Sequence, residues 1–219
     1  MNIFNELNLK NELCFDVGAN IGTKTEKFLS IGASVVCIEP QEYCISVLES
    51  KFANNDKVKI IKNALGSTNE TKTMFISDAH TISTLSNDFI LETTKNRFKN
   101  SVWDKQQIVN ILTLDDIIKK YGIPKFCKID VEGYESEILK GLSTQIKYIS
   151  IEFIPELKHK TFECIDIMNK LGNYSYNYVD GESQNFIFSE WCNNEKIINF
   201  LSNNNDFERS FGDLYAKLV

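Results

Sequence analysis

The sequence has no apolar stretch approaching the ~18 consecutive residues that a membrane-spanning helix requires. Its first residues, MNIFNELNLKNEL, lack the basic segment and apolar run that are typical of a signal peptide. We therefore expect a cytoplasmic protein without a membrane span. The 219 residues contain only three prolines and are 42% hydrophobic, which is enough apolar material for one folded domain.

An excess of positive charge is also missing. The chain has 24 basic and 30 acidic side chains, a formal net charge of −6, and no cluster of Lys and Arg. Because nucleic-acid binders need basic side chains to neutralise phosphates, we expect no nucleic-acid partner. A small substrate fits this composition better.

Cysteine pairs with metal-ligand spacing are absent as well. None of the six cysteines forms a CxxC pair. In a reducing compartment they are expected to be small buried side chains, and this spacing predicts no zinc site.

Short apolar runs alternate with helical patterns along most of the chain. Runs at 13–17, 33–39, 57–65, 125–131 and 148–154 are separated by helix-like stretches, a pattern typical of parallel strands covered on both faces. Two further runs, YSYNYV (174–179) and NFIF (185–188), flank the turn DGES and predict an antiparallel hairpin that ends the sheet. The residues thus predict five or six parallel strands and a reversed last strand.

The middle of the chain breaks this alternation. Residues 67–111 offer two strand-like pieces, TKTMFIS and QQIVNILT, and no periodicity appears across 78–105. We expect a long functional loop or lid there. The domain prediction is one domain over 1–219, with this insertion and a C-terminal tail from about residue 190.

The segment DVGANIG, Asp16 to Gly22, is a glycine-rich turn between a strand and a helix. Such a turn lets a ligand approach the backbone closely. A nicotinamide dinucleotide requires G-x-G-x-x-G, but Asn20 and Thr23 stand where the second and third glycines would be. The carboxylate of Asp16 would also repel a pyrophosphate, so a dinucleotide is disfavoured.

S-adenosylmethionine has a sulfonium and no phosphate, so a nearby acidic group is electrostatically favourable. Glu39 ends the second predicted strand, 23 residues after Asp16. A carboxylate at this position can accept hydrogen bonds from both ribose hydroxyls. The loop and Glu39 together therefore favour S-adenosylmethionine as the cofactor.

Three segments resemble the FkbM family of class I S-adenosylmethionine-dependent methyltransferases. They are DVGANIG at 16–22, LTLDDIIKKYG at 112–122 and KIDVEGYESEILKG at 128–141, within a resemblance that spans roughly 12–190. The resemblance implies a Rossmann-like, doubly wound α/β sheet of seven mostly parallel strands with an antiparallel last strand. It also implies methyl transfer to an oxygen, typically a hydroxyl of a saccharide or secondary metabolite. The cofactor-binding residues that we predict are Asp16, Gly18, Asn20, Gly22, Thr23, Glu39, Asn63, Ala64 and Asp130.

Catalysis requires alignment of acceptor, methyl group and sulfur, and removal of one proton. Asp130 and Glu132 are two residues apart at the end of a strand, so both can face the acceptor, and we predict that one of them is the base. His80 is a further candidate if the lid closes. Alternatively, Glu132 caps the following helix, or Asp130 with Glu152 or Glu132 holds a divalent ion, although we predict no metal.

Two other functions remain open from the sequence. One is a NAD-dependent oxidoreductase, and the other is a catalytically inactive cofactor-binding protein that acts as an assembly partner. Methylation of an amine rather than a hydroxyl is also open. The leading prediction is a methyltransferase whose partner is a small-molecule acceptor.

Overall fold

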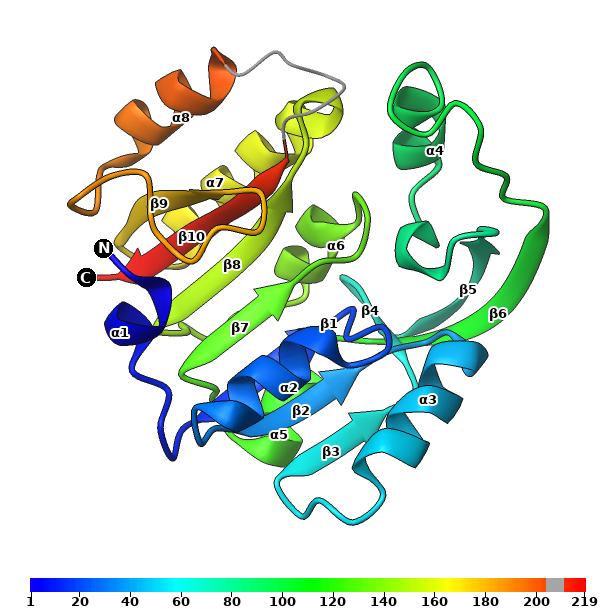
Figure 1. Cartoon of the computed structure of the whole chain (residues 1–219). Coiled ribbons are helices and arrows are strands. Elements are labelled where there is room, and N and C mark those ends of the chain that lie inside the picture. Colours follow the sequence, from blue (N-terminus) through cyan, green and yellow to red (C-terminus); the bar gives the residue numbers. More distant parts are fainter. Residues whose placement is uncertain (204–210) are drawn as a thin grey trace.

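The computed structural model describes residues 1–203 and 211–219, and these residues form two sheets flanked by helices (Figure 1). The larger sheet has the strand order β3-β2-β1-β7-β8-β10-β9, and the smaller has the order β4-β6-β5. The strands are β1 Leu13–Val17, β2 Ser34–Ile38, β3 Val58–Ile61, β4 Ala64–Leu65, β5 Glu70–Ile76, β6 Lys105–Leu112, β7 Phe126–Ile129, β8 Tyr148–Phe153, β9 Tyr174–Asp180 and β10 Gly212–Leu218. The helices are α1 Ile3–Leu7, α2 Thr23–Ser30, α3 Glu42–Phe52, α4 Asn87–Thr93, α5 Leu114–Tyr121, α6 Glu135–Lys140, α7 Lys158–Leu171 and α8 Asn194–Ser202, with short 3₁₀ helices η1 His80–Ile82 and η2 Pro155–Leu157.

The larger sheet is mostly parallel, as predicted. Strands β3, β2, β1, β7 and β8 pair in parallel, and β10 lies antiparallel between β8 and β9. Val17 pairs in register with Ile38 on one side and Ile129 on the other. The carboxyl ends of β1, β2 and β7 therefore meet at one edge, where ligands bind in open α/β sheets.

The predicted hairpin between 174–179 and 185–188 is wrong. Strand β9 pairs with β10 instead, and 185–188 forms no strand. Pairing with β10 buries Leu214 and Ala216 completely, whereas Ile187 of the predicted strand is 47% exposed. The adjacent segment instead lies along the other edge of β9, where the amide of Ile187 donates to the carbonyl of Tyr178 and Cys192 pairs with Tyr176.

The region predicted as a tail from about residue 190 contains regular structure. Helix α8 packs on β9 and α7, and β10 completes the sheet. Residues 204–210, also within the predicted tail, lie outside the described residues.

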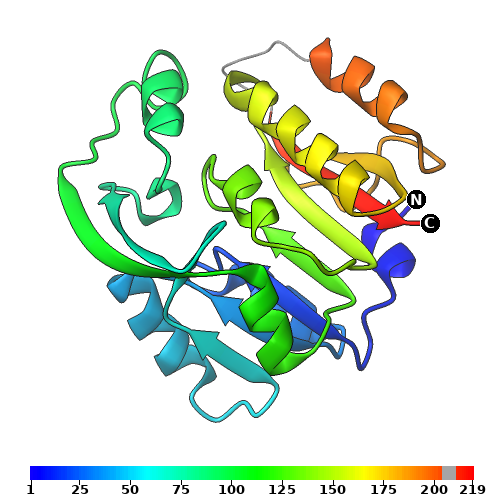
Figure 2. The same ribbon diagram turned by 180° about the vertical axis from the view of Figure 1, so that it is seen from behind.

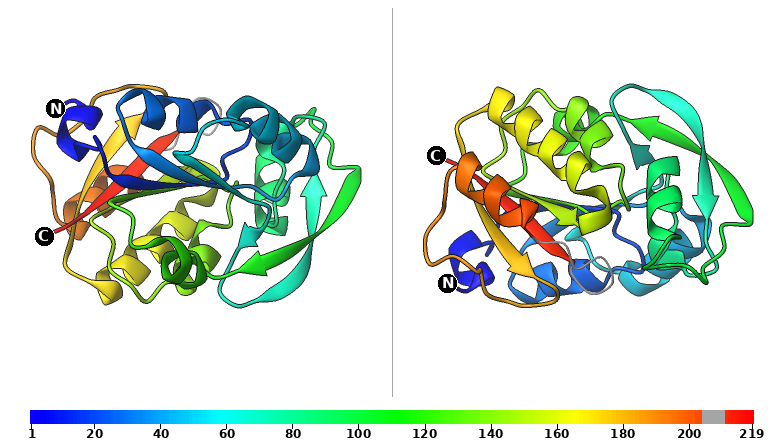
Figure 3. Two further views of the ribbon diagram at one scale, coloured as in Figure 1. Left: turned by 90° about the horizontal axis from the view of Figure 1, so that it is seen from below. Right: turned by 90° about the horizontal axis from the view of Figure 1, so that it is seen from above.

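Helices cover both faces of the larger sheet (Figures 2 and 3). Helices α1, α2 and α3 pack on one face, and α5, α6, α7 and α8 pack on the other. Helix α5 has the two features by which a helix is predicted from sequence. Leu114, Ile117 and Ile118 form its buried stripe, and Thr113 with Asp116 forms a capping box at its start. This two-faced cover explains the continuous apolar runs of the parallel strands.

The insertion forms the smaller sheet and stands at the side of the larger one (Figure 3). The two predicted strands are confirmed as β5 and β6, but the segment 78–105, predicted as a loop, contains η1 and α4. A buried ion pair joins the insertion to η2, with Arg97 Nε 2.9 Å from Glu156 Oε1. That all of 1–219 forms a single domain stays a prediction.

All six cysteines are buried and unpaired, as expected from their spacing. Within the described ranges, we find no helix with the length and apolar character needed to cross a bilayer.

Candidate active site

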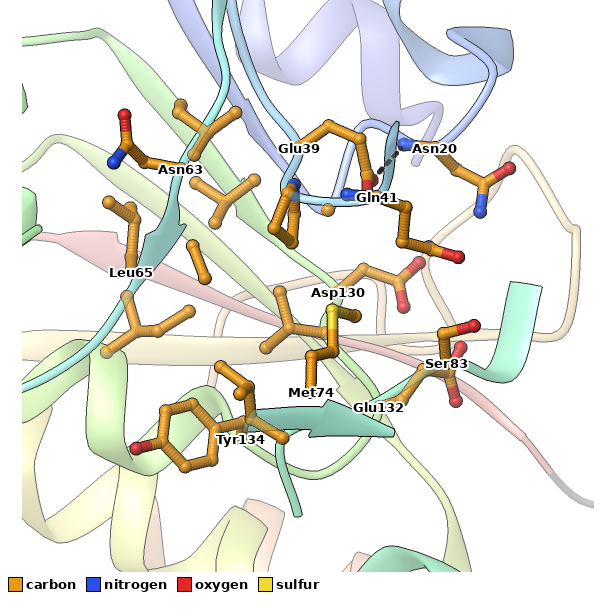
Figure 4. A pocket seen from close by; sticks show the side chains of 18 of the residues that line it. Asn20, Glu39, Gln41, Asn63, Leu65, Met74, Ser83, Asp130, Glu132 and Tyr134 are labelled. Carbon is orange, nitrogen blue, oxygen red and sulfur yellow. Dashed lines mark hydrogen bonds between the residues drawn. The ribbon is translucent and has the colours of Figure 1, made fainter. Parts of the chain in front are cut away.

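A cavity lies at the carboxyl ends of β1, β2 and β7, and the insertion forms one of its walls (Figure 4). In Figure 4, Asn63, Leu65 and Tyr134 lie at one end of the cavity. Asp130 and Glu132 lie toward the other end. Of the residues predicted from the sequence, the cavity lining includes Gly18, Asn20, Glu39, Asn63, Ala64, Asp130 and Glu132. The predicted residues that do not line it are Asp16, Gly22, Thr23 and His80.

Gly18 allows the loops after β1 and β7 to touch. Its φ is +78°, and a Cβ atom placed there would lie 1.9 Å from the carbonyl oxygen of Asp130. Only glycine fits this contact. The first loop therefore presents bare backbone to the cavity beside Asp130.

Asn20 occupies the left-handed region with a φ of +50°, which asparagine tolerates better than most residues. Its Oδ1 accepts a hydrogen bond from the amide of Ile21 at 2.9 Å. Its Nδ2 donates to the carbonyl of His80 at 3.1 Å. Asn20 thus shapes the first loop and ties it to the insertion.

Glu39 is buried, and its carboxylate is held by backbone amides. Oε2 accepts from the amide of Asn20, and Oε1 accepts from the amide of Gln41, both at 2.8 Å. Burial raises the pKa of Glu39 to about 7, while the amides of Gln41 and Asn20 act to lower it. Each carboxylate oxygen can accept one further hydrogen bond.

The part of the cavity wall that follows β7 is rich in carboxylates. Asp130 Oδ2 lies 2.5 Å from the ammonium nitrogen of Lys128, which is buried. Burial acts to lower the pKa of Lys128, but the charges of Asp130, Asp213 and Asp16 outweigh it and raise that pKa. Lys128 is therefore a fixed positive charge among several acidic groups.

For Glu132, burial and acidic neighbours outweigh the positive charge of Lys128. Burial, followed by the charges of Glu152, Asp130 and Glu135, raises its pKa well above the ordinary range, and only Lys128 opposes them. The pKa of Glu152 is raised in the same direction, first by burial and then by its acidic neighbours. Glu132 thus lines the cavity as a carboxyl group with enhanced affinity for a proton.

The main chain at Glu132 is strained, with a φ of +57°. Glu135 Oε1 accepts from the amides of Val131 at 3.1 Å and Gly133 at 3.2 Å. Helix α6 has no side-chain cap at its first residue. The amide-binding role that we considered for Glu132 is therefore taken by Glu135, and the Glu132 side chain remains available to the cavity.

Asp130, Glu132 and Glu152 bring their carboxylates close together. One ligand atom from each lies within 4.8 Å of the others, and within the described residues this is the only such group of His, Cys, Asp and Glu side chains. Lys128 already supplies positive charge beside Asp130. The absence of a metal stays a prediction.

Asp16 is buried and does not line the cavity. Strand alternation places it in the same row as Cys37 and Lys128, and its Oδ2 accepts a 2.6 Å hydrogen bond from Thr25 Oγ1 on α2. Direct cofactor binding by Asp16 therefore stays a prediction without a contact to support it. The contact that is present links β1 to α2.

The imidazole of His80 packs against Tyr43, with ring centroids 5.6 Å apart, and does not line the cavity. Its carbonyl oxygen accepts from the side-chain amides of Asn20 and Gln41, each at 3.1 Å. The structure thus brings the main chain of His80, rather than its ring, to the first loop.

Sequence reasoning missed Gln41, Lys128 and Thr84. Lys128 could have been found from strand alternation, because it shares a face with Asp130 two residues later. Gln41 follows the second strand directly and had no motif to mark it. Thr84, whose hydroxyl lies 2.6 Å from the Glu132 carbonyl, depends on a long-range contact that no local pattern reveals.

Comparison with known proteins places the chain in a family. The sequence profile of the methyltransferase FkbM domain matches residues 16–206, which is most of the chain. A comparison with curated proteins found no significant match.

Among solved structures, the chain is similar to precorrin-6y C5,15-methyltransferase from Geobacter metallireducens. The TM-score is 0.53 at 8% identity, over 98% of this chain and 86% of that chain. It also matches magnesium protoporphyrin IX methyltransferase from Synechocystis with a TM-score of 0.49 at 11% identity, over 99% of this chain and 74% of that chain. At such identities the first likeness concerns the fold alone, and it agrees with the predicted class I architecture.

Proposed function

Since the chain belongs to the FkbM methyltransferase domain family, and is therefore an S-adenosylmethionine-dependent methyltransferase, we propose that it methylates a hydroxyl oxygen of a small acceptor. The acceptor class that we propose is a saccharide or a secondary metabolite. The family assignment sets aside the oxidoreductase alternative. The observation that carries the proposal is the position of Glu132, a carboxyl group with a raised pKa, in the wall of the cavity.

The cavity fits the methyl donor in shape and charge. Gly18 leaves bare backbone at the first loop, and Glu39 keeps one free acceptor position on each carboxylate oxygen. These features suit the ribose hydroxyls. Ala64, Leu65 and Met74 provide an apolar surface suited to adenine, near the amide of Asn63. No Lys or Arg lines the cavity within the described residues, which suits a sulfonium and would leave a pyrophosphate unpaired.

When bound, the donor supplies a methyl group that is already activated by the sulfonium. The protein must then orient the acceptor oxygen and remove its proton. Glu132 and Asp130 lie beside each other at this end of the cavity, and Asp130 is engaged with Lys128. Glu132 is therefore the better placed group to take the proton. A positioned base contributes a rate factor of about 10²–10⁴.

The raised pKa of Glu132 suits this role, because a base is most effective when its pKa approaches the working pH. Surrounding carboxylates also restrict the acceptor. A phosphorylated or carboxylated acceptor would be repelled by Glu132, Asp130 and Glu152, whereas a neutral hydroxyl compound would not. The same carboxylates would attract a cationic amine, so the experiment below also includes amine acceptors.

The test is a screen for S-adenosylhomocysteine release with neutral sugars, amino sugars and sugar phosphates as acceptors. Wild-type protein is compared with E132Q, which removes the proton-accepting carboxylate but preserves shape. E137Q is the matched control, since Glu137 lies on α6 next to Lys140 and does not line the cavity.

We expect turnover with a neutral hydroxyl acceptor, a loss of about 10²-fold or more in E132Q, and no change in E137Q. Turnover that is restricted to amino sugars would move the proposal to amine methylation. Unchanged turnover in E132Q would remove Glu132 as the base. A chelator added to the wild-type assay separates a metal-assisted reaction from one that Glu132 carries alone.

A further inference from the structure

Thr84 connects the insertion to the main chain of Glu132. Its hydroxyl donates a 2.6 Å hydrogen bond to the Glu132 carbonyl and accepts one from the amide of Ser86 at 2.8 Å. Thr84 is only 1% exposed. Its amide and carbonyl also pair with Phe75 of β5, which fixes its main chain to the smaller sheet.

Glu132 needs such support because its backbone conformation is unfavourable for a side chain. Its φ of +57° precedes a φ of +85° at Gly133, where a Cβ atom would lie 2.7 Å from Leu157. Glu135 binds the amides on either side of Glu132, at Val131 and Gly133. Thr84 binds the carbonyl between them, so the peptide units at Glu132 are held from two sides.

We propose that Thr84 is a positioning residue, whose hydroxyl holds the Glu132 main chain so that the Glu132 carboxylate faces the acceptor end of the cavity. The inference rests on the proposed role of Glu132 as the base. It makes the insertion part of the catalytic machinery, although Thr84 itself does not act on the acceptor.

Binding of the methyl donor near Asn20 and Glu39 should not depend on the Thr84 hydroxyl. The links between this region and the insertion run through the carbonyl of His80, which accepts from Asn20 and Gln41, and through Gln107, which donates to the carbonyl of Pro40. Loss of the Thr84 hydroxyl leaves these bonds in place. The predicted effect is therefore on turnover and not on affinity for the methyl donor.

Three variants isolate the hydroxyl. T84V removes it with little change of shape, and T84S retains it. T93V is the matched control, because Thr93 is a fully buried threonine of the same insertion whose hydroxyl binds the Phe89 carbonyl within its own helix. Any general effect of losing a buried hydroxyl from the insertion appears in T93V as well.

The first measurement needs no acceptor. Hydrogen–deuterium exchange of a peptide covering 131–133 should be about 10-fold faster in T84V and unchanged in T84S and T93V. Affinity for S-adenosylhomocysteine, measured by titration calorimetry, should stay within about threefold of wild type in all three. Unchanged exchange in T84V, or equal acceleration in T93V, would overturn the proposal. Should T84V fail to fold, T84A, which also lacks the hydroxyl, takes its place with the same expected and contradicting results.

The second measurement is a double-mutant cycle on turnover with an acceptor from the screen. We expect T84V to lower kcat about 10-fold in the wild-type background and to have no further effect in E132Q. An equal loss in both backgrounds would show that Thr84 does not act through Glu132. If E132Q itself retains wild-type turnover, the proposed base fails, and that outcome is distinct from a failure of Thr84.

Discussion

Two carboxylic acids in the wall of the cavity, Glu39 and Glu132, are held in different ways. Glu39, after β2, has one backbone amide on each oxygen; burial raises its pKa to about 7, and these amides limit the rise. Glu132, after β7, has carboxylate neighbours instead of amides, and its pKa is raised well above the ordinary range, mainly by burial. Both residues line the same cavity.

The difference separates binding from proton transfer. A carboxylate fixed by amides has a defined orientation and suits the recognition of hydroxyl groups. A carboxyl group crowded by like charges binds a proton more tightly and suits general base catalysis. One cavity thus contains a carboxylate suited to recognition, Glu39, and a carboxyl group suited to proton transfer, Glu132.

The largest expected effect is on the pH dependence of turnover. Glu132 must be deprotonated to act, and its pKa is raised by burial and by Glu152 and Asp130. The rate should therefore rise with pH by about 10-fold per unit until that pKa is passed. Measured pH profiles of kcat should show this limb in wild type and lose it in E132Q. The same rise of kcat with pH in wild type and E132Q would contradict the assignment of proton transfer to Glu132.

A smaller effect concerns the pH dependence of stability. Burial raises the pKa of Glu135 to about 7, above its ordinary value of 4.5, so the folded state retains this proton more strongly than the unfolded state. Its contribution to the free energy of unfolding is full below about pH 4.5 and is lost as pH rises through about 7. We expect this loss to be about 3 kcal/mol.

Urea unfolding at pH 5 and pH 8 measures this change. The decrease in the free energy of unfolding should be smaller in E135Q, whose amide oxygen can still accept from Val131 and Gly133. If the free energy of unfolding of E135Q is lower than that of wild type by the same amount at pH 5 and pH 8, Glu135 does not titrate in this range.

The smallest expected effect concerns Asp16 and tests whether this residue takes part in cofactor binding. Asp16 is buried and accepts a hydrogen bond from Thr25, so T25V should lower the free energy of unfolding by about 1–2 kcal/mol. Since Asp16 does not line the cavity, affinity for S-adenosylhomocysteine should change little. T25S is the control that keeps the hydroxyl. Loss of affinity in T25V without loss of stability would restore Asp16 as a direct cofactor contact.

Local patterns were sufficient for most of the fold. The parallel strands, the stripe of α5 and its capping box follow from period, length and end residues within one segment. The hairpin after β9 was mispredicted because β10, more than 30 residues away, forms the ladder with β9, and the adjacent segment reaches the other edge of β9 only through isolated pairs such as Cys192 with Tyr176. Pairing of distant strands depends on tertiary burial, which a single window does not contain.

The site was predictable to the same extent. Residues directly after strands, such as Gly18, Glu39 and Asp130, line the cavity because strand ends meet at one edge. The side chain of Asp16 instead binds Thr25 on α2. The ring of His80 packs against Tyr43. Thr84 reaches Glu132 across 48 positions, so no spacing rule could pair them.

The most direct test of the separate roles of Glu39 in recognition and Glu132 in proton transfer is titration calorimetry of S-adenosylhomocysteine with wild type, E39Q and E132Q. We expect E39Q to weaken binding about 10-fold or more, because its amide cannot accept on both sides, and E132Q to stay within about threefold of wild type. Equal losses in the two variants, or a larger loss in E132Q, would contradict the separation of binding from proton transfer.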